Sequence, residues 1–346
     1  MNQDVTYKIL TSDAVEIFLL SVAAFLLAMM LTPVYTALAY RYRFWKKQRS
    51  TSTSGETLEV FTKLHAAKFR RNIPTMAGVI GVVTIAVVTL VFNFERETYL
   101  PLAALIGGAV VGLIDDVINL RSNGHGVAGL RSSVKFTMIV AIGVALGWYF
   151  FTKIGVDSVQ IPFLGAIAIG WWIVPLFAFV VTATANAVNI SDGLDGLAGG
   201  LLAMAFAAFG IIALFQGQIV LAGFCFTVIG ALLSYLWFNI YPARFFMGDV
   251  GSFAFGVALG VVAILTNSLL LLPVIGFLFV IEAGSSLIQI VSKRFFGKKI
   301  FISAPVHHHL EASGWPETKV TMRFWVIGCV VATLGIILAL AGGHIT

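Results

Sequence analysis

The sequence predicts an all-α integral membrane protein with about ten transmembrane helices, folded as a single domain over residues 1–346. Of the 346 residues, 59% are hydrophobic and only 11% are charged, whereas a soluble domain carries about 25% charged residues. The mean hydropathy is +0.97. The apolar runs are about 20 residues long, which is the length of a membrane-spanning helix. Helices are favoured because they satisfy their own backbone hydrogen bonds in lipid.

Ten predominantly apolar segments divide the chain. They lie at about 14–40, 76–94, 99–114, 134–151, 162–182, 197–215, 218–240, 252–266, 269–291 and 324–341. The first segment is too long for the core of a signal peptide, and its positive charges follow it. Only a short polar stretch separates the eighth segment from the ninth, so a single kinked pair is an alternative. Ten spans place both termini on the same side.

The distribution of basic residues predicts the orientation. Nineteen of the 22 Lys and Arg residues follow the odd-numbered segments, and only Lys8, Arg96 and Lys153 lie on the other side. Basic loops remain in the cytoplasm. The odd-numbered helices therefore exit into the cytoplasm, and both termini face outward. All the polar motifs described below then fall on the cytoplasmic side, although they were not used to set the orientation.

The stretch 186–199 is a polar cluster between two apolar segments. Asn186, Asn189 and Asp192 are spaced three apart, and Asp195 continues the series. This spacing stacks side chains on one face of a helical turn. Amide and carboxylate oxygens suit Mg²⁺ or the polar groups of a nucleotide. The alternative is a plain helix cap formed by Ser191 or Asp192.

Asp115 and Asp116 are adjacent carboxylates at the end of the third segment. They repel each other at the negative end of the helix dipole, which a cation or proton would relieve. Neighbouring helical residues point about 100° apart, so we expect one to face the site and the other to support it. The alternative is a pair of solvated acids at a helix end.

Asp249 is a lone acid at the entrance of the eighth segment, bracketed by Gly248 and Gly251. A carboxylate on flexible backbone at a helix N-terminus suits a metal ion that also binds phosphate oxygens. An N-cap is the alternative. The aromatic ring of Phe246 could stack on a base or anchor the chain at the membrane interface.

His307, His308 and His309 are consecutive, so they cannot all ligate one ion in a simple helix or strand. Hydrogen bonds from the imidazoles to phosphate or sugar oxygens fit better. Glu282 lies within the ninth segment and needs a partner, which the sequence does not identify. These motifs together fit Mg²⁺-assisted phosphoryl transfer, in which the ion neutralises a diphosphate. A site at the membrane face implies that one substrate is a lipid.

The motifs resemble those of the polyprenyl-phosphate N-acetylhexosamine-1-phosphate transferases. The matching stretches are Asp115-Asp116, 186–196, 246–252 and the histidine run, and the stretches 279–282, 304–311 and 323–325 favour the branch that uses UDP-MurNAc-pentapeptide. Two stretches depart from the usual pattern. One is 72–78, which reads Asn-Ile-Pro-Thr-Met-Ala-Gly, and the other is 117–133.

The resemblance implies transfer of phospho-MurNAc-pentapeptide to undecaprenyl phosphate, which gives lipid I and UMP in peptidoglycan synthesis and requires Mg²⁺. It implies a multi-pass protein of the bacterial inner membrane, a homodimer and no nucleic-acid partner. The residue roles that it implies are Asp249 and Asn189 at the metal, Asp115 or Asp116 at the lipid phosphate, Asn186, Asp192 and Asp195 at nucleotide or diphosphate, Phe246, Asn239 and Gln289 at uridine, His307, His308 and His309 at phosphate or sugar, with His308 also counted as catalytic, and Lys68 and Lys135 as phosphate partners.

Two other functions remain open from the sequence. One is a sibling transferase that uses UDP-N-acetylglucosamine, toward which 117–121 leans. The other is a proton-coupled transporter, which would need acids near the middle of the bilayer. Release of UMP separates an enzyme from a carrier, and the choice of UDP-sugar separates the two transferases.

Overall fold

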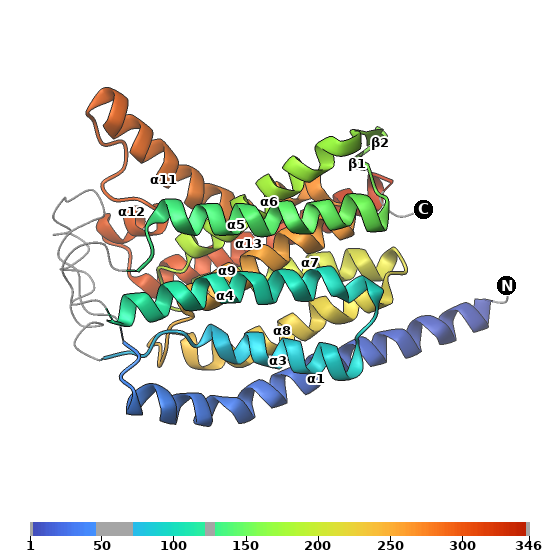
Figure 1. Cartoon of the computed structure of the whole chain (residues 1–346), viewed down its shortest axis with the longest axis horizontal. Coiled ribbons are helices and arrows are strands. Elements are labelled where there is room, and N and C mark those ends of the chain that lie inside the picture. Colours follow the sequence, from blue (N-terminus) through green and yellow to red (C-terminus); the bar gives the residue numbers. More distant parts are fainter. Residues whose placement is uncertain (1–2, 46–71, 122–128, 344–346) are drawn as a thin grey trace.

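The computed structural model describes residues 3–45, 72–121 and 129–343. These form a bundle of long helices, with one small hairpin, that run roughly parallel to one axis (Figure 1). The helices are α1 (Gln3–Arg41), α3 (Gly78–Phe92), α4 (Tyr99–Arg121), α5 (Ser132–Tyr149), α6 (Ile173–Ser191), α7 (Leu197–Phe215), α8 (Ile219–Asn239), α9 (Gly248–Leu265), α10 (Leu272–Ile275), α11 (Phe277–Phe296), α12 (Val306–Ala312) and α13 (Glu317–Ala341).

Within the described ranges, eight helices are long and apolar enough to cross a membrane, or nine if a bent pair counts as one span. The bent pair joins residues 269–275 to α11 at an angle of 80°. The break lies at Gly276, and Pro273 stands in the first turn of α10. Proline and glycine are the usual causes of sharp bends. The remaining apolar helix, α3, has 15 residues. The prediction of a helical membrane protein is confirmed.

Three predicted segment boundaries were wrong. The segment 162–182 begins as a hairpin of β1 (Ser158–Ile161) and β2 (Gly165–Ala168), and the helix starts only at Ile173. The segment 99–114 continues to Arg121, so Asp115 and Asp116 lie inside α4 and not at its end. The segment 324–341 begins seven residues earlier, at Glu317. In the second and third segments polar residues continue the helix, and in the first apolar residues form a hairpin. Hydropathy alone therefore misplaces the ends of these helices.

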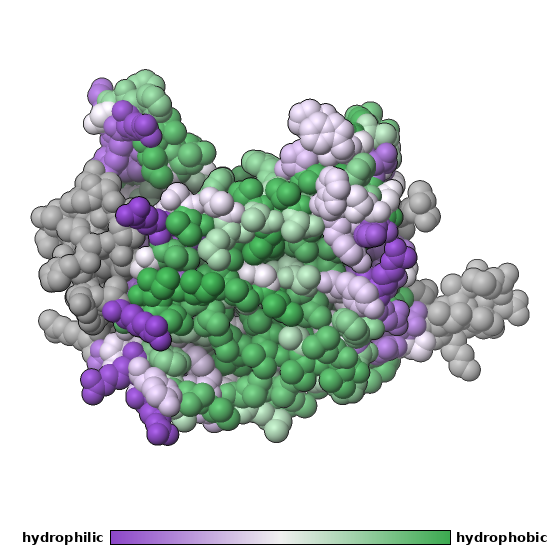
Figure 2. Space-filling view, in the orientation of Figure 1, coloured by the Kyte–Doolittle hydropathy of each residue, from purple (hydrophilic) through white to green (hydrophobic). Residues whose placement is uncertain are grey.

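The core is centred on α9, because 89% of its apolar stretch is buried, against 22% for α1. α9 packs against α4 on one side and α6 on another. Small residues allow this close approach: a Cβ at Gly108 would come within 2.6 Å of the Phe253 carbonyl oxygen, and one at Gly256 within 2.7 Å of Ala185 Cα. Figure 2 shows the apolar surface over the middle of the bundle, with hydrophilic residues toward its two ends.

The ends of the bundle differ. The N-terminus of α9, the end of α4, the end of α6 and the short helix α12 lie at one end, and both chain termini lie at the other (Figure 1). The four polar motifs of the sequence therefore meet at one end of the molecule. The hairpin lies at the end that holds the termini, with Phe163 and Leu164 exposed at its tip.

Candidate active site

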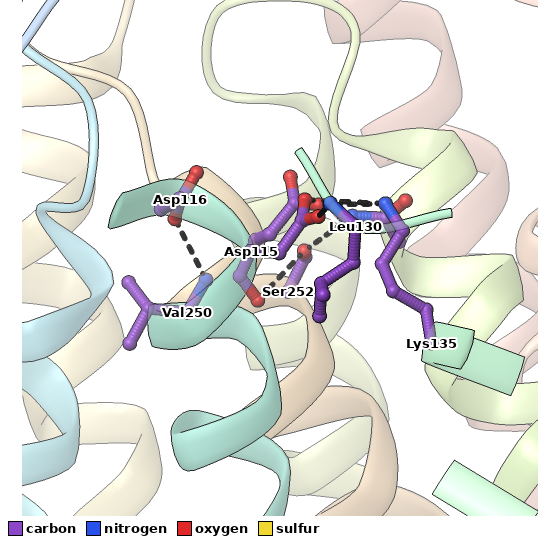
Figure 3. Close-up of polar contacts among 8 residues, drawn as sticks. Asp115, Asp116, Leu130, Lys135, Val250 and Ser252 are labelled. Carbon is purple, nitrogen blue, oxygen red and sulfur yellow. Dashed lines mark hydrogen bonds and ion pairs between the residues drawn. The ribbon is translucent and has the colours of Figure 1, made fainter. Parts of the chain in front are cut away.

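Two aspartates from different helices converge on one lysine. Lys135 Nζ, near the start of α5, lies 3.2 Å from Asp115 Oδ2 and 3.4 Å from Asp249 Oδ2. Asp115 also accepts the Leu130 backbone N–H at 2.6 Å through its other oxygen (Figure 3). Asp115 is 2% exposed and Asp249 is 16% exposed. The two carboxylates are therefore held close together by a cation between them.

Asp116 points away from this cluster. Its Oδ2 accepts the Val250 backbone N–H at 3.0 Å, at the start of α9. Asp116 is fully buried. As expected for neighbours on a helix, one acid of the pair faces the cluster and the other contacts the backbone of an adjoining helix (Figure 3). The assignment of Asp116 as a catalytic group stays a prediction.

The amides of the 186–199 stretch lie on α6, which ends at Ser191. Asn189 Nδ2 donates to Ser252 Oγ at 2.8 Å, one turn into α9 from Asp249. This bond brings Asn189 beside the first turn of α9. Asn186 Nδ2 donates to the Thr182 carbonyl oxygen of its own helix at 2.8 Å. Asp192 is the half-buried C-cap residue that follows the helix.

Asp195 and Asn239 hold backbone in place. Asp195 Oδ2 accepts the Ala243 N–H at 2.9 Å, and its own N–H donates to Glu317 Oε1 at 2.7 Å. Asn239 Oδ1 accepts the Gly196 N–H and its amide nitrogen donates to the Phe245 carbonyl oxygen, both at 2.9 Å. Both side chains are buried. They fix the loops around the site, so their predicted ligand contacts stay predictions.

Glu282 has His307 as its partner, which the sequence did not identify. His307 Nδ1 lies 2.7 Å from Glu282 Oε2, and both side chains are almost fully buried. The opposite edge of the imidazole lies against Gly193, where an added Cβ would come within 2.9 Å of His307 Cε1. The buried pair thus joins α11 and α12 to the loop that follows Asp192.

His308 and His309 take separate positions. His308 Nδ1 lies 2.8 Å from Glu311 Oε2, three residues along α12. His309 Nδ1 accepts the Ile302 N–H at 3.2 Å. Gln289 binds the same loop from α11: its Oε1 accepts the N–H groups of Ile300 and Phe301 at 3.0 and 3.1 Å. The three imidazoles therefore contact three different groups: Glu282, Glu311 and the Ile302 backbone.

Phe246 lies in a backbone ladder that ties two distant segments together. Its N–H donates to the Pro74 carbonyl oxygen at 2.8 Å, and its carbonyl accepts the Ala77 N–H at 3.0 Å. The segment 72–78 is one of the stretches that departs from the family pattern. Asn72, at the start of this segment, has φ +49°, and asparagine tolerates this left-handed conformation better than most residues.

The structure therefore connects Asp115, Lys135 and Asp249 through α9 to Asn189, and then through the 192–196 loop to His307. Lys68 lies outside the described residues. Sequence reasoning gave no role to Ser252, Leu130, Glu311 or Glu317. The spacing of three between Asp249 and Ser252, and between His308 and Glu311, is a signal that could have found two of them.

The donor set suits a divalent cation. Among the described residues, no group of three or more His, Cys, Asp or Glu is arranged to hold a metal ion. Asp115 Oδ2 and Asp249 Oδ2, however, already face a common cation in Lys135. Mg²⁺ is commonly bound through one or two carboxylates, with water and substrate phosphates completing its shell. The residues fit an ion that arrives with a diphosphate.

Comparison with known proteins gives the class. Residues 98–267 match the model of glycosyl transferase family 4. This match covers the chain from α4 to α9, and it includes Asp115, Lys135, Asn189, Asp192 and Asp249. The fold and the match define a membrane-embedded transferase.

Full-length relatives narrow the class. The chain is 39% identical to the phospho-N-acetylmuramoyl-pentapeptide-transferase of Chloroflexus aurantiacus, over 97% of this chain and 92% of that protein. It is 38% identical to the protein of the same name from Geobacillus sp., over 91% of this chain and 95% of that protein. It is 37% identical to the protein of that name from Desulforudis audaxviator, over 90% of this chain and 95% of that protein. The chain belongs to the phospho-N-acetylmuramoyl-pentapeptide-transferase family.

Proposed function

We propose that the chain transfers phospho-MurNAc-pentapeptide from UDP-MurNAc-pentapeptide to undecaprenyl phosphate, giving lipid I and UMP, with Mg²⁺ as cofactor. The observation that carries the proposal is the convergence of Asp115 and Asp249 on Lys135 at the end of the bundle that also holds the 192–196 loop and the histidine helix. Such a site can bind a diphosphate and the phosphate of a lipid together.

The reaction exchanges one phosphorus–oxygen bond for another. An oxygen of the lipid phosphate attacks the phosphorus that carries the sugar, and the bond between the two phosphates of the UDP-sugar breaks, so UMP leaves. Asp115 faces the cluster and would accept any proton on the lipid phosphate. Lys135 would hold phosphate oxygens, and Asp249 with Asn189 would bind Mg²⁺. The ion supplies charge neutralisation to the diphosphate.

The remaining site residues fit the donor substrate. Asn186, on α6, and Asp192, just after its end, would contact the nucleotide or diphosphate. The half-buried ring of Phe246 would stack on uracil. His308 and His309 would bind phosphate or sugar oxygens. Asn239, Asp195, Gln289 and His307 would support the loops around the site through the bonds described above. Positioning of both substrates is the main source of rate in such transfers.

The membrane topology is part of the proposal. We place the site at the cytoplasmic face of a bacterial inner membrane and both termini outside. The distribution of Lys and Arg supports this orientation. The termini lie at the end opposite the site (Figure 1), so a cytoplasmic site would place both of them outside. We also expect a homodimer, on the resemblance alone.

The test uses purified protein in detergent with Mg²⁺ and undecaprenyl phosphate. Radiolabelled UDP-MurNAc-pentapeptide and UDP-N-acetylglucosamine are offered in separate reactions. We expect release of labelled UMP and a lipid-linked product from the first donor only. Product from UDP-N-acetylglucosamine alone would assign the chain to the sibling activity. Absence of UMP release with either donor, together with uptake of solute into vesicles, would support a carrier.

A further inference from the structure

Asp116 supplies a helix cap from outside the helix that it caps. The residue that precedes α9, Met247, offers no side-chain cap. The N–H groups of a first helical turn have no partner within the helix. Asp116 Oδ2, on α4, accepts one of them, the Val250 N–H, at 3.0 Å. It does across two helices what a Ser or Asp N-cap does within one.

Two glycines bring the carboxylate and the backbone into contact. Gly248 has φ +77°, and a Cβ there would lie 2.6 Å from Asp116 Oδ2 and 2.7 Å from the Met76 nitrogen. A Cβ at Gly112, one turn before Asp116, would lie 2.5 Å from Val250 Cα. The first turn of α9 therefore has little room to move relative to α4.

Asp249 lies between the two residues that Asp116 contacts. Its carboxylate is directed to Lys135, which also contacts Asp115. Asp115 and Asp116 are consecutive in α4, so one residue sets the position of the turn that carries Asp249 while its neighbour faces that carboxylate. An anionic group near the N-terminus of α9 is also favoured by the helix dipole.

We propose that Asp116 is a positioning residue: it fixes the first turn of α9 and thereby orients Asp249 toward Asp115 and Lys135. Asp116 acts as a hydrogen-bond acceptor and exchanges no proton with either substrate. The role of Asp249 rests on the proposed function, whereas the capping of α9 does not.

Hydrogen–deuterium exchange of the backbone amides at 248–252 tests the cap without any turnover. Asp116→Ala removes the acceptor, and exchange there should rise about tenfold or more. Asp116→Asn keeps an acceptor oxygen and should exchange like wild type. Asp157→Ala, at the far end of the bundle, is the control for a general loss of stability. Unchanged exchange in Asp116→Ala would overturn the proposal.

Kinetics then separate positioning from proton transfer. Asp116→Asn should retain kcat within about tenfold of wild type, whereas Asp115→Asn should lose far more. Asp116→Ala should need more Mg²⁺ for half-maximal activity, with the KM for polyprenyl phosphate unchanged. If Asp116→Asn is as inactive as Asp115→Asn while its amides exchange normally, the charge itself is required and the proposal is wrong.

If Asp116→Ala does not fold, the kcat of Asp116→Asn still distinguishes positioning from proton transfer, because this variant removes the charge and keeps an acceptor oxygen. Failure of the proposed function would appear differently: the wild type would release no UMP with either donor, and the exchange pattern would be unaffected.

Discussion

Asp249→Asn is the sharpest test of the site because it changes charge at nearly constant volume. The stability effect should be small. Asp249 is one of two carboxylates beside a partly exposed lysine at 3.4 Å, and a partly exposed ion pair contributes about 1 kcal/mol or less. Removing one carboxylate also relieves its repulsion with Asp115. The bundle, held by the burial of α9, should fold as before.

The effect on turnover should be large. A metal ion bound at a transferring phosphate is worth several kcal/mol of transition-state stabilisation. Loss of about 3–5 kcal/mol corresponds to a fall in rate of about 10²–10⁴-fold. A shortfall of this size in an otherwise folded protein would show that Asp249 acts on the chemistry.

Release of radiolabelled UMP at saturating substrates, measured over a range of Mg²⁺ concentrations, checks this expectation. Asp157→Asn, a matched change at the opposite end of the bundle, should leave the rate unaltered, and melting of both variants in detergent should follow the wild type. Near-normal turnover of Asp249→Asn at saturating Mg²⁺ would refute the metal assignment.

Three further predictions concern the surroundings. Gly193→Ala should push the His307 ring out of place, at a cost of about 1–3 kcal/mol from overpacking, so it should lower the melting temperature and raise the KM for the UDP-sugar. Gln289→Ala removes hydrogen bonds to the 300–301 backbone, each worth about 1 kcal/mol, so trypsin should cut faster after Lys298. Chelation with EDTA should abolish UMP release and added Mg²⁺ should restore it. The melting temperature should hardly move, because Lys135 remains as a cation beside both carboxylates when the metal ion is removed.

Matched controls keep these outcomes interpretable. Gly284→Ala changes a glycine of α11 at which an added Cβ would have no neighbouring atom within 4 Å, and its effect on the KM should be nil. Gln160→Ala removes a glutamine side chain from the hairpin end and should leave cleavage after Lys298 unaltered. A Gly193→Ala enzyme with normal kinetics, or a Gln289→Ala loop as resistant as wild type, would contradict the corresponding role. Full activity after exhaustive chelation would contradict the requirement for a metal ion.

The sequence predicted the membrane helices and the grouping of the polar motifs, because both follow from the physics of lipid. Apolar runs near 20 residues must be helical there. Carboxylates and amides at the ends of such runs can gather only where water and substrate reach them. The alternation of charged and neutral loops placed 115–116, 186–199, 249 and 307–309 on one side without any structural information.

The sequence could not predict which side chain faces the substrates and which holds the scaffold. Asp195, Asn239 and Gln289 carry the same groups as Asp192 and Asn189. The structure adds that these three side chains contact backbone far away in the chain or in a neighbouring loop, as Asn239 does with Gly196. Such partners depend on how the helices pack, and no local pattern encodes them. The hairpin 158–168 was not predicted because its apolar residues run directly into the apolar residues of the helix that follows.

The pair Asp115-Asp116 shows why packing decides function here. Two chemically identical acids are adjacent, yet a rotation of about 100° along the helix directs one to Lys135 and the other to the backbone of α9. α9 is the most buried helix of the bundle, so a shift of its first turn would disturb its contacts with both α4 and α6. The same burial that makes α9 the centre of the core thus holds Asp249 at a fixed distance from Asp115. A site assembled from four distant segments keeps its geometry because one rigid helix touches most of them.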